Sequence, residues 1–70
     1  MRQKLNIMVN GFGEEVLENT SIKDLILHFK EGDTDLIVEY NGRFVYPTQY
    51  AQLIVQEGDR VEFINPNFGG

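Results

Sequence analysis

The chain is 70 residues long, contains no cysteine and one histidine, and carries eleven acidic against six basic side chains. This length allows a single small domain with one hydrophobic core. The lack of cysteine excludes disulfide bonds, thiolate zinc sites and any catalytic or persulfide-bearing thiol. A single histidine excludes histidine clusters, so only carboxylate-based metal sites remain.

The formal net charge of −5 gives no general attraction to phosphate backbones, and Lys and Arg are scattered singly along the chain. An acidic surface favours a protein partner with a basic face, although it can equally serve solubility alone. No apolar stretch reaches the roughly 18 residues needed to span a bilayer, and residues 1–4 do not lead into the apolar core of a signal peptide. We therefore expect a soluble, cytoplasmic protein that binds neither nucleic acid nor a membrane.

The first part of the chain predicts a β-hairpin. Leu5, Ile7 and Val9 alternate with more polar residues, which is typical of a half-buried strand. Asn10-Gly11 then provides turn chemistry that tolerates a positive φ. Residues 14–18 are predicted to form the returning strand, with either residue 16 or residue 17 facing inward.

A helix is predicted over residues 21–31. Thr20 and Ser21 are candidate N-caps, and Asp24 lies three residues after Ser21, the spacing of a capping box. Lys30 suits the helix C-terminus and Gly32 can end the helix in a left-handed conformation. One stripe of this helix is apolar at positions i, i+3, i+4 and i+7, which are Ile22, Leu25, Ile26 and Phe29.

The second half of the chain predicts three more strands. Residues 36–40 alternate, Asn41-Gly42 is the strongest hairpin signal in the sequence, and residues 43–46 return from it until Pro47 ends the pairing. Residues 48–55 are expected to form a helical turn and a loop, followed by a turn at residues 57–59. The last strand is predicted over residues 60–65, with Val61 and Phe63 on one face.

The predicted order is therefore β-β-α-β-β-β, which indicates an α+β fold of the ubiquitin-like β-grasp type. In that fold a mixed sheet wraps one helix, and the first and last strands pair in parallel at the sheet centre. The C-terminus would then project from a central strand. We accordingly divide the chain into a β-grasp domain (residues 1–65) and a flexible, reactive C-terminal tail (residues 66–70).

Few interior residues suggest chemistry. His28 lacks a second ligand and is expected on the surface rather than in a metal site. Glu14-Glu15 and the pair Asp33 and Asp35 could serve as acid/base or cation sites, but acids are common in turns and solvated charge is the simpler interpretation. Gly11-Phe12-Gly13 lacks the strand-to-helix context of a phosphate-binding loop. We predict no metal site and no catalytic triad.

The C-terminal sequence Pro66-Asn67-Phe68-Gly69-Gly70 is more informative. The diglycine is either an ordinary frayed end or a reactive group whose α-carboxylate is activated, for example as an acyl-adenylate. Glycines have no Cβ and can enter a narrow tunnel. Pro66 would stiffen the exit from the last strand, and Phe68 offers an apolar anchor for a partner.

The chain combines six characteristic segments, which are Val9-Asn10-Gly11, Ser21-Ile22-Lys23-Asp24-Leu25-Ile26, Val38-Glu39-Tyr40-Asn41-Gly42, Val45-Tyr46-Pro47, Glu57-Gly58-Asp59-Arg60-Val61-Glu62 and Gly69-Gly70. Together these segments resemble the ThiS/MoaD family of β-grasp sulfur carriers, and within it the thiamine-pathway carriers. Asn67-Phe68 stands where many thiamine carriers have a small or aliphatic residue, often with a third glycine. Pro66 is instead similar to the small subunit of molybdopterin synthase.

The resemblance implies a carrier that is not itself an enzyme and binds no cofactor or metal. A ThiF-like, E1-like adenylyltransferase would use ATP to adenylate Gly70, and the adenylate would become a thiocarboxylate with sulfur from a donor such as a cysteine desulfurase. A ThiG-like thiazole synthase would then receive the sulfur. Gly69 would permit threading, Phe68 and Pro66 would aim the tail, and Phe63 would either join a docking face on the sheet or belong to the core.

Three alternatives stay open at this point. The chain could serve the same chemistry in another pathway, as a MoaD-like carrier for molybdopterin, or in tRNA thiolation or cysteine synthesis. It could be a ubiquitin-like protein modifier whose terminal glycine forms an isopeptide bond with a lysine. It could also be a plain β-grasp binding module.

Overall fold

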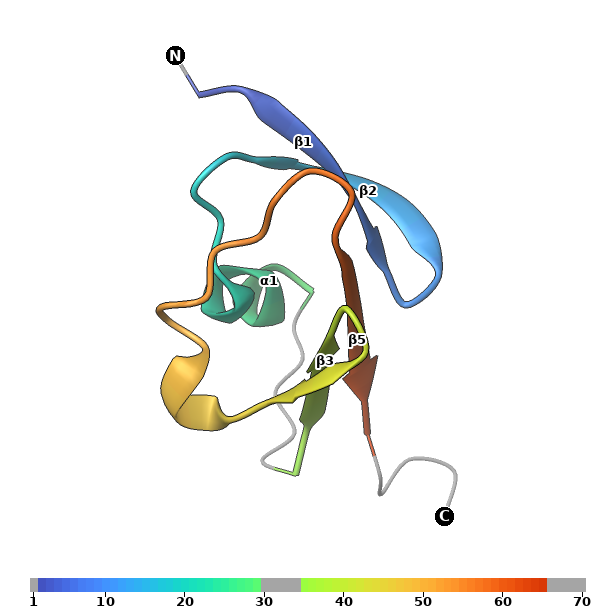
Figure 1. The fold of residues 1–70 in the computed structure, drawn as a ribbon, viewed down its shortest axis with the longest axis vertical. Helices are drawn as coiled ribbons and strands as arrows, with labels where there is room; N and C mark the ends of the chain where they lie inside the picture. The colour runs from blue at the N-terminus through green and yellow to red at the C-terminus, as the bar shows by residue number, and fades with distance from the viewer. Residues whose placement is uncertain (1, 30–34, 66–70) are drawn as a thin grey trace.

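The computed structural model describes residues 2–29 and 35–65, which form a five-stranded sheet with one α-helix packed on it (Figure 1). In chain order the elements are β1 (Lys4–Val9), β2 (Phe12–Leu17), α1 (Ile22–His28), β3 (Ile37–Tyr40), β4 (Arg43–Val45), the 3₁₀ helix η1 (Pro47–Gln49) and β5 (Arg60–Ile64).

The sheet has the strand order β2-β1-β5-β3-β4, so β5 lies at its centre between β1 and β3. The first and last strands pair in parallel, with Met8 opposite Arg60 and Val9 opposite Val61. The other neighbouring strands pair antiparallel. This mixed sheet confirms the predicted β-grasp arrangement.

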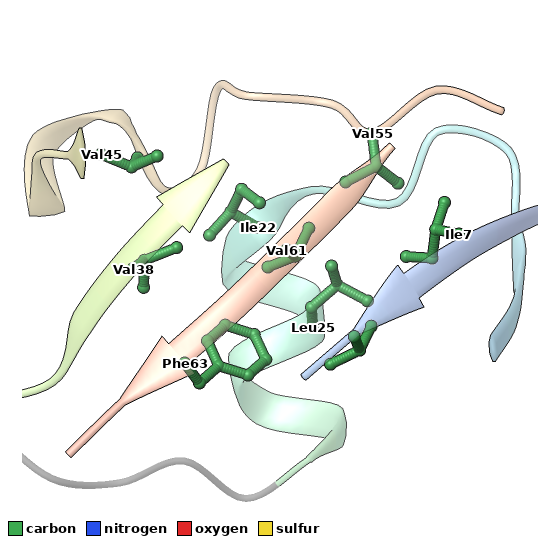
Figure 2. Close-up of a cluster of buried hydrophobic side chains, with 9 residues drawn as sticks. Ile7, Ile22, Leu25, Val38, Val45, Val55, Val61 and Phe63 are labelled. Atoms are coloured by element: carbon green, nitrogen blue, oxygen red, sulfur yellow. The ribbon is translucent and has the colours of Figure 1, made fainter. Parts of the chain in front are cut away.

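The core lies between one face of the sheet and α1. Figure 2 shows side chains from β1, β3 and β5 gathered over the helix, which contributes Ile22 and Leu25. Val61 and Phe63 are both buried, which confirms that they share one face of β5. The nine buried apolar residues are Ile7, Val9, Ile22, Leu25, Val38, Val45, Val55, Val61 and Phe63.

The start of α1 follows the predicted capping box. Asp24 N–H donates to Ser21 Oγ, and Ser21 N–H donates to Asp24 Oδ2, each at 3.0 Å.

The predicted helix extended to residue 31, whereas α1 ends at His28. Phe29 leaves helical geometry at φ −90° and ψ 5°, and its ring packs 6.4 Å from that of Phe63. Lys30 and Gly32, the predicted end signals, lie outside the described residues. With seven residues, α1 is too short to cross a bilayer, and the described part of the chain has no other α-helix.

The turns predicted at Asn10-Gly11 and Asn41-Gly42 are both present. Asn10 and Gly11 have φ values of 52° and 84°, and Asn41 and Gly42 have 51° and 82°, so each turn has two left-handed residues as a type I′ turn requires. Because the first turn is so tight, β2 begins at Phe12 and not at residue 14 as predicted. Val16 is the inward residue of β2 and packs on the core, while Leu17 is exposed.

The segment between β4 and β5 closes the open end of the core. After η1 the chain makes an isolated bridge between Ile54 and Ser21, and Val55 N–H donates to Thr20 O at 2.9 Å. Val55 is thereby buried next to the helix start. This segment lies on the same side of the sheet as α1 (Figure 1), which leaves the other face, the outer face, open in the described residues.

Candidate functional site

The candidate site begins where β5 leaves the sheet. This strand ends at Ile64, after which residues 66–70 follow in the chain. Four predicted site residues, Pro66, Phe68, Gly69 and Gly70, lie outside the described residues. The structure therefore describes the strand that leads to the predicted tail and the surfaces around that strand.

Phe63 belongs to the core and does not line a docking face. Its side chain is 7% exposed, and Val38 lies directly opposite it on β3. The alternation of β5 explains this placement: Val61 is fully buried, so the residue two positions later faces the same way. The partner-binding role considered for Phe63 is thus corrected, and the alternative of a core residue is confirmed.

The outer face of the sheet carries an apolar cluster that the sequence analysis missed. We define the outer patch as Ile37, Phe44, Tyr46 and Ile64, each of which is next in sequence to a buried residue of β3, β4 or β5. Phe44, Tyr46 and Ile64 are 53%, 62% and 38% exposed. The Phe44 and Tyr46 rings form an edge-to-face pair with centroids 4.8 Å apart. The signal was present in residues 43–46, because a buried Val45 requires Phe44 and Tyr46 to point outward.

Two carboxylates lie beside the outer patch on the same face of the sheet. Glu39 on β3 is directly opposite Glu62 on β5, and both alternate with buried residues. Like charges directly opposite each other in a sheet are unfavourable. A cationic group placed over the pair would remove this repulsion, so the patch is electrostatically suited to a basic partner surface.

A buried carboxylate fixes the turn before β5. Asp59 accepts hydrogen bonds from the Tyr40 hydroxyl, from Asn41 Nδ2 at 3.1 Å and from Gln56 N–H at 2.6 Å. Burial alone would raise the pKa of Asp59, but the hydrogen bonds from Tyr40, Gln56 and Asn41 outweigh it and lower the pKa below 3.8. Burial and the hydrogen bond to Asp59 raise the pKa of Tyr40 to about 12, so its hydroxyl remains a donor at neutral pH.

The two hairpin asparagines hold β5 from opposite sides. Asn41 exchanges two hydrogen bonds with Arg60, whose N–H donates to Asn41 Oδ1 and whose carbonyl accepts from Asn41 N–H, each at 2.8 Å. Asn10 donates its N–H to Val61 O at 3.0 Å and accepts from Phe63 N–H at 2.7 Å through Oδ1. Both turns thus anchor the central strand as well as connecting their own strands.

The remaining sequence candidates do not form a second site. His28 is exposed and its ring lies edge-on to Phe29 at 4.8 Å. Glu14 and Glu15 are adjacent in β2, so they point to opposite faces of the sheet. Asp33 lies outside the described residues. Within residues 2–29 and 35–65, no three His, Asp or Glu side chains gather where they could hold a metal ion.

Comparisons with known proteins agree with this fold. The ThiS family model matches residues 7–70. The crystal structure of a thiamine biosynthesis protein (ThiS) from Geobacter metallireducens superposes with a TM-score of 0.80 and 29% sequence identity, covering 94% of this chain and 100% of that one. Among curated proteins, no sequence matches significantly.

A structure from a study of SUMO mimicry in DNA repair has a TM-score of 0.55 and 15% identity over 91% of each chain, which shows a shared fold alone. The ThiS match is of a different kind, because the family model covers almost the whole sequence, from the first strand to the diglycine. The chain therefore belongs to the ThiS family of β-grasp proteins.

Proposed function

We propose that the chain is the sulfur carrier of thiazole formation in thiamine biosynthesis, with the sulfur held as a thiocarboxylate on Gly70. The observation that carries the proposal is the family match, which runs to Gly70 on a fold whose central strand leads into that diglycine sequence. The similarity to a thiamine biosynthesis protein favours the thiamine pathway. The chain itself would be a recycled co-substrate rather than an enzyme.

The chemistry requires activation of an otherwise inert carboxylate. An oxygen of the Gly70 carboxylate attacks the α-phosphorus of ATP on the partner enzyme, and pyrophosphate leaves. Sulfide then attacks the carbonyl carbon, a C–S bond forms, and AMP leaves with the oxygen. Where the donor is the persulfide of a cysteine desulfurase, two thiols supply the electrons that release its outer sulfur as sulfide, and they become a disulfide. The thiocarboxylate passes its sulfur to a thiazole synthase. We expect these steps in the cytoplasm, where ATP is available.

The outer patch is our proposed docking surface for the adenylating enzyme. Ile64 belongs to the patch and immediately precedes the residues that lead to the tail, so a partner seated there would lie next to the tail. The exposed Phe44 and Tyr46 supply apolar contact area, and aromatic residues are enriched where interfaces gain most of their energy. Glu39 and Glu62 would face basic side chains of that enzyme.

The test is intact-protein mass spectrometry after incubation with a ThiF-like enzyme, ATP and sulfide. Replacement of one carboxylate oxygen by sulfur adds about 16 Da, by atomic mass, to the chain when adenylation is followed by thiolysis. Omission of ATP and deletion of Gly70 should each abolish the gain. A full-length chain that gains no mass under these conditions would refute the carrier proposal.

The acceptor is tested separately with the sulfur-loaded protein. Sulfur transfer to a ThiG-like thiazole synthase supports the thiamine pathway. Transfer only to the large subunit of a molybdopterin synthase would replace that pathway with the MoaD-like alternative. Conjugates of the chain to lysines of other proteins, without transferable sulfur, would instead indicate a modifier.

A further inference from the structure

Asn10 has two roles at the end of β1. Its backbone is left-handed, with φ 52°, and begins the turn to β2. Its side-chain Oδ1 reaches across to β5 and accepts a hydrogen bond from Phe63 N–H at 2.7 Å, although 53 residues separate the two in sequence. The turn itself requires only the first of these roles, which glycine could also perform.

The side chain extends the parallel pairing beyond the end of β1. Met8 N–H donates to Asp59 O at 2.9 Å, and Asn10 N–H donates to Val61 O at 3.0 Å. If the parallel ladder continued, the backbone carbonyl of Asn10 would accept the next hydrogen bond, from Phe63 N–H. The turn redirects the chain at Asn10, and its side-chain oxygen accepts this bond instead.

We propose that Asn10 is a positioning residue for the sulfur-carrying tail, because its Oδ1 extends the two-sided support of β5 from Val61 to Phe63. The inference rests on the proposed function. Without this bond, support from β1 would end at Val61, and β3 would be the one described strand still paired with the end of β5, where Ile64 is opposite Ile37. The end of β5, paired on one side alone, would then point over a wider range of directions.

This role predicts a specific kinetic effect. Productive binding must restrict the end of β5 to one direction. A more mobile strand end therefore loses more conformational entropy on binding. Once the tail is seated, contacts within the enzyme hold the carboxylate, and the chemical step is unchanged. Loss of the Asn10 side-chain bond should therefore raise the KM for the carrier and leave kcat nearly unaltered.

Three variants separate this role from general stability. Asn10→Gly keeps the left-handed turn and removes the acceptor oxygen, whereas Asn10→Asp keeps an acceptor at the same place and should rescue. Asn19→Gly is the matched control. Asn19 also has a left-handed backbone, with φ 69°, and it lies in the turn before α1, where its side chain makes no hydrogen bond within the described residues.

Amide hydrogen exchange of Phe63 by NMR tests the geometry independently of function. Arg60 N–H, held at the other end of β5 by Asn41, is the internal reference, because global destabilisation accelerates both amides. In Asn10→Gly we expect exchange at Phe63 to rise about three- to tenfold relative to Arg60, as befits one lost hydrogen bond. The ratio should stay near its wild-type value in Asn10→Asp and Asn19→Gly.

Adenylation kinetics test the consequence, at a temperature where every variant is folded. Asn10→Gly should raise KM for the carrier roughly three- to tenfold with kcat within about twofold, in line with the loss of one ordering hydrogen bond. An unchanged exchange ratio, or an unchanged KM despite faster exchange, would refute the role of Asn10 alone. A wild-type chain that never gains sulfur would refute the proposed function, and the role of Asn10 with it.

Discussion

The hydroxyl of Tyr40 on β3 donates a hydrogen bond to the carboxylate of Asp59, in the turn that precedes β5. The two residues are 19 positions apart in sequence, and Asp59 is only 9% exposed. The bond joins the β3–β4 hairpin to the start of the central strand. We expect this contact to be among the larger single contributions to stability, because its acceptor is both charged and buried.

Tyr40→Phe tests that contribution. Removing a donor to a charged acceptor costs about 1.5–3 kcal/mol of unfolding free energy. The measurement is urea denaturation at neutral pH. Tyr46→Phe is the matched control, because Tyr46 is 62% exposed, and it should stay within about 0.5 kcal/mol of wild type. Equal unfolding free energies for the two variants would contradict a stabilising role of the hydrogen bond from Tyr40 to Asp59.

Asp59 also predicts a pH dependence of stability. Its pKa is lower in the folded chain than the ordinary value of 3.8, so folding favours the ionised carboxylate. The resulting stabilisation is complete well above that value and is lost as the pH falls through the lower, folded pKa. The pKa of Asp24 is also lowered, first by the hydrogen bond from the Ser21 backbone N–H and then by the Ser21 side chain. Asp24 therefore contributes a pH dependence of the same sign as that of Asp59.

Urea midpoints measured between about pH 7 and pH 2.5 should therefore fall on the acid side. Asp59→Asn should be less stable than wild type at neutral pH, and the difference should narrow as the acid limit is approached. Glu62→Gln, which removes an exposed carboxylate that faces Glu39, should by contrast be no less stable than wild type at neutral pH. A constant difference between Asp59→Asn and wild type across this range would contradict the predicted linkage.

The second hairpin turn predicts opposite results for two Gly→Ala substitutions. Gly42 has φ 82° in a left-handed turn position, whereas Gly13 lies in β2 without a positive φ. An added Cβ would meet nothing within 4 Å at either position, so only the backbone conformation distinguishes them. Gly42→Ala should lose about 1–2 kcal/mol, and Gly13→Ala should be neutral or gain up to about 1 kcal/mol. Thermal denaturation of both variants measures this difference. Equal changes in melting temperature for the two variants would contradict the prediction.

The outer patch predicts a binding defect without a folding defect. Phe44→Ser should raise the KM for the carrier in adenylation at least about fivefold, as expected when an interface anchor worth over 1 kcal/mol is truncated. Its melting temperature should change little, because Phe44 is 53% exposed. Leu27→Ser, at a 66% exposed position on α1, is the matched control and should leave KM unchanged. Equal KM values for the two variants would place the docking surface elsewhere.

Local features of the fold were predictable because they depend on atoms close together in sequence. The capping box joins Ser21 to Asp24, three residues on, and the Asn-Gly turns need only their own left-handed backbones. The helix end was less predictable. The apolar stripe that includes Phe29 continued the predicted helix past it, whereas α1 ends at His28 and Phe29 packs near Phe63 from outside helical geometry.

The faces of the strands were predictable only in part. Alternation correctly paired Val61 with Phe63, but a period of two does not say which face is covered. The path of the chain between β2 and β3 decides this, because it places α1 over Val61 and Phe63 and leaves Phe44, Tyr46 and Ile64 outside. Phe63 therefore belongs to the core, and the exposed apolar cluster is made of residues that sequence reasoning had not selected.

The sequence by itself determined the order of elements, the N-cap of α1, the two Asn-Gly turns, and the diglycine on which the proposed chemistry depends. Only the tertiary structure decided how the central strand is held, through Asn41 at Arg60 and Asn10 at Phe63. The physical reason is that each asparagine is read locally as a turn residue, since a left-handed backbone is a local property. The side-chain oxygen of each asparagine finds its backbone N–H donor only when strand order and register place β5 beside the turn.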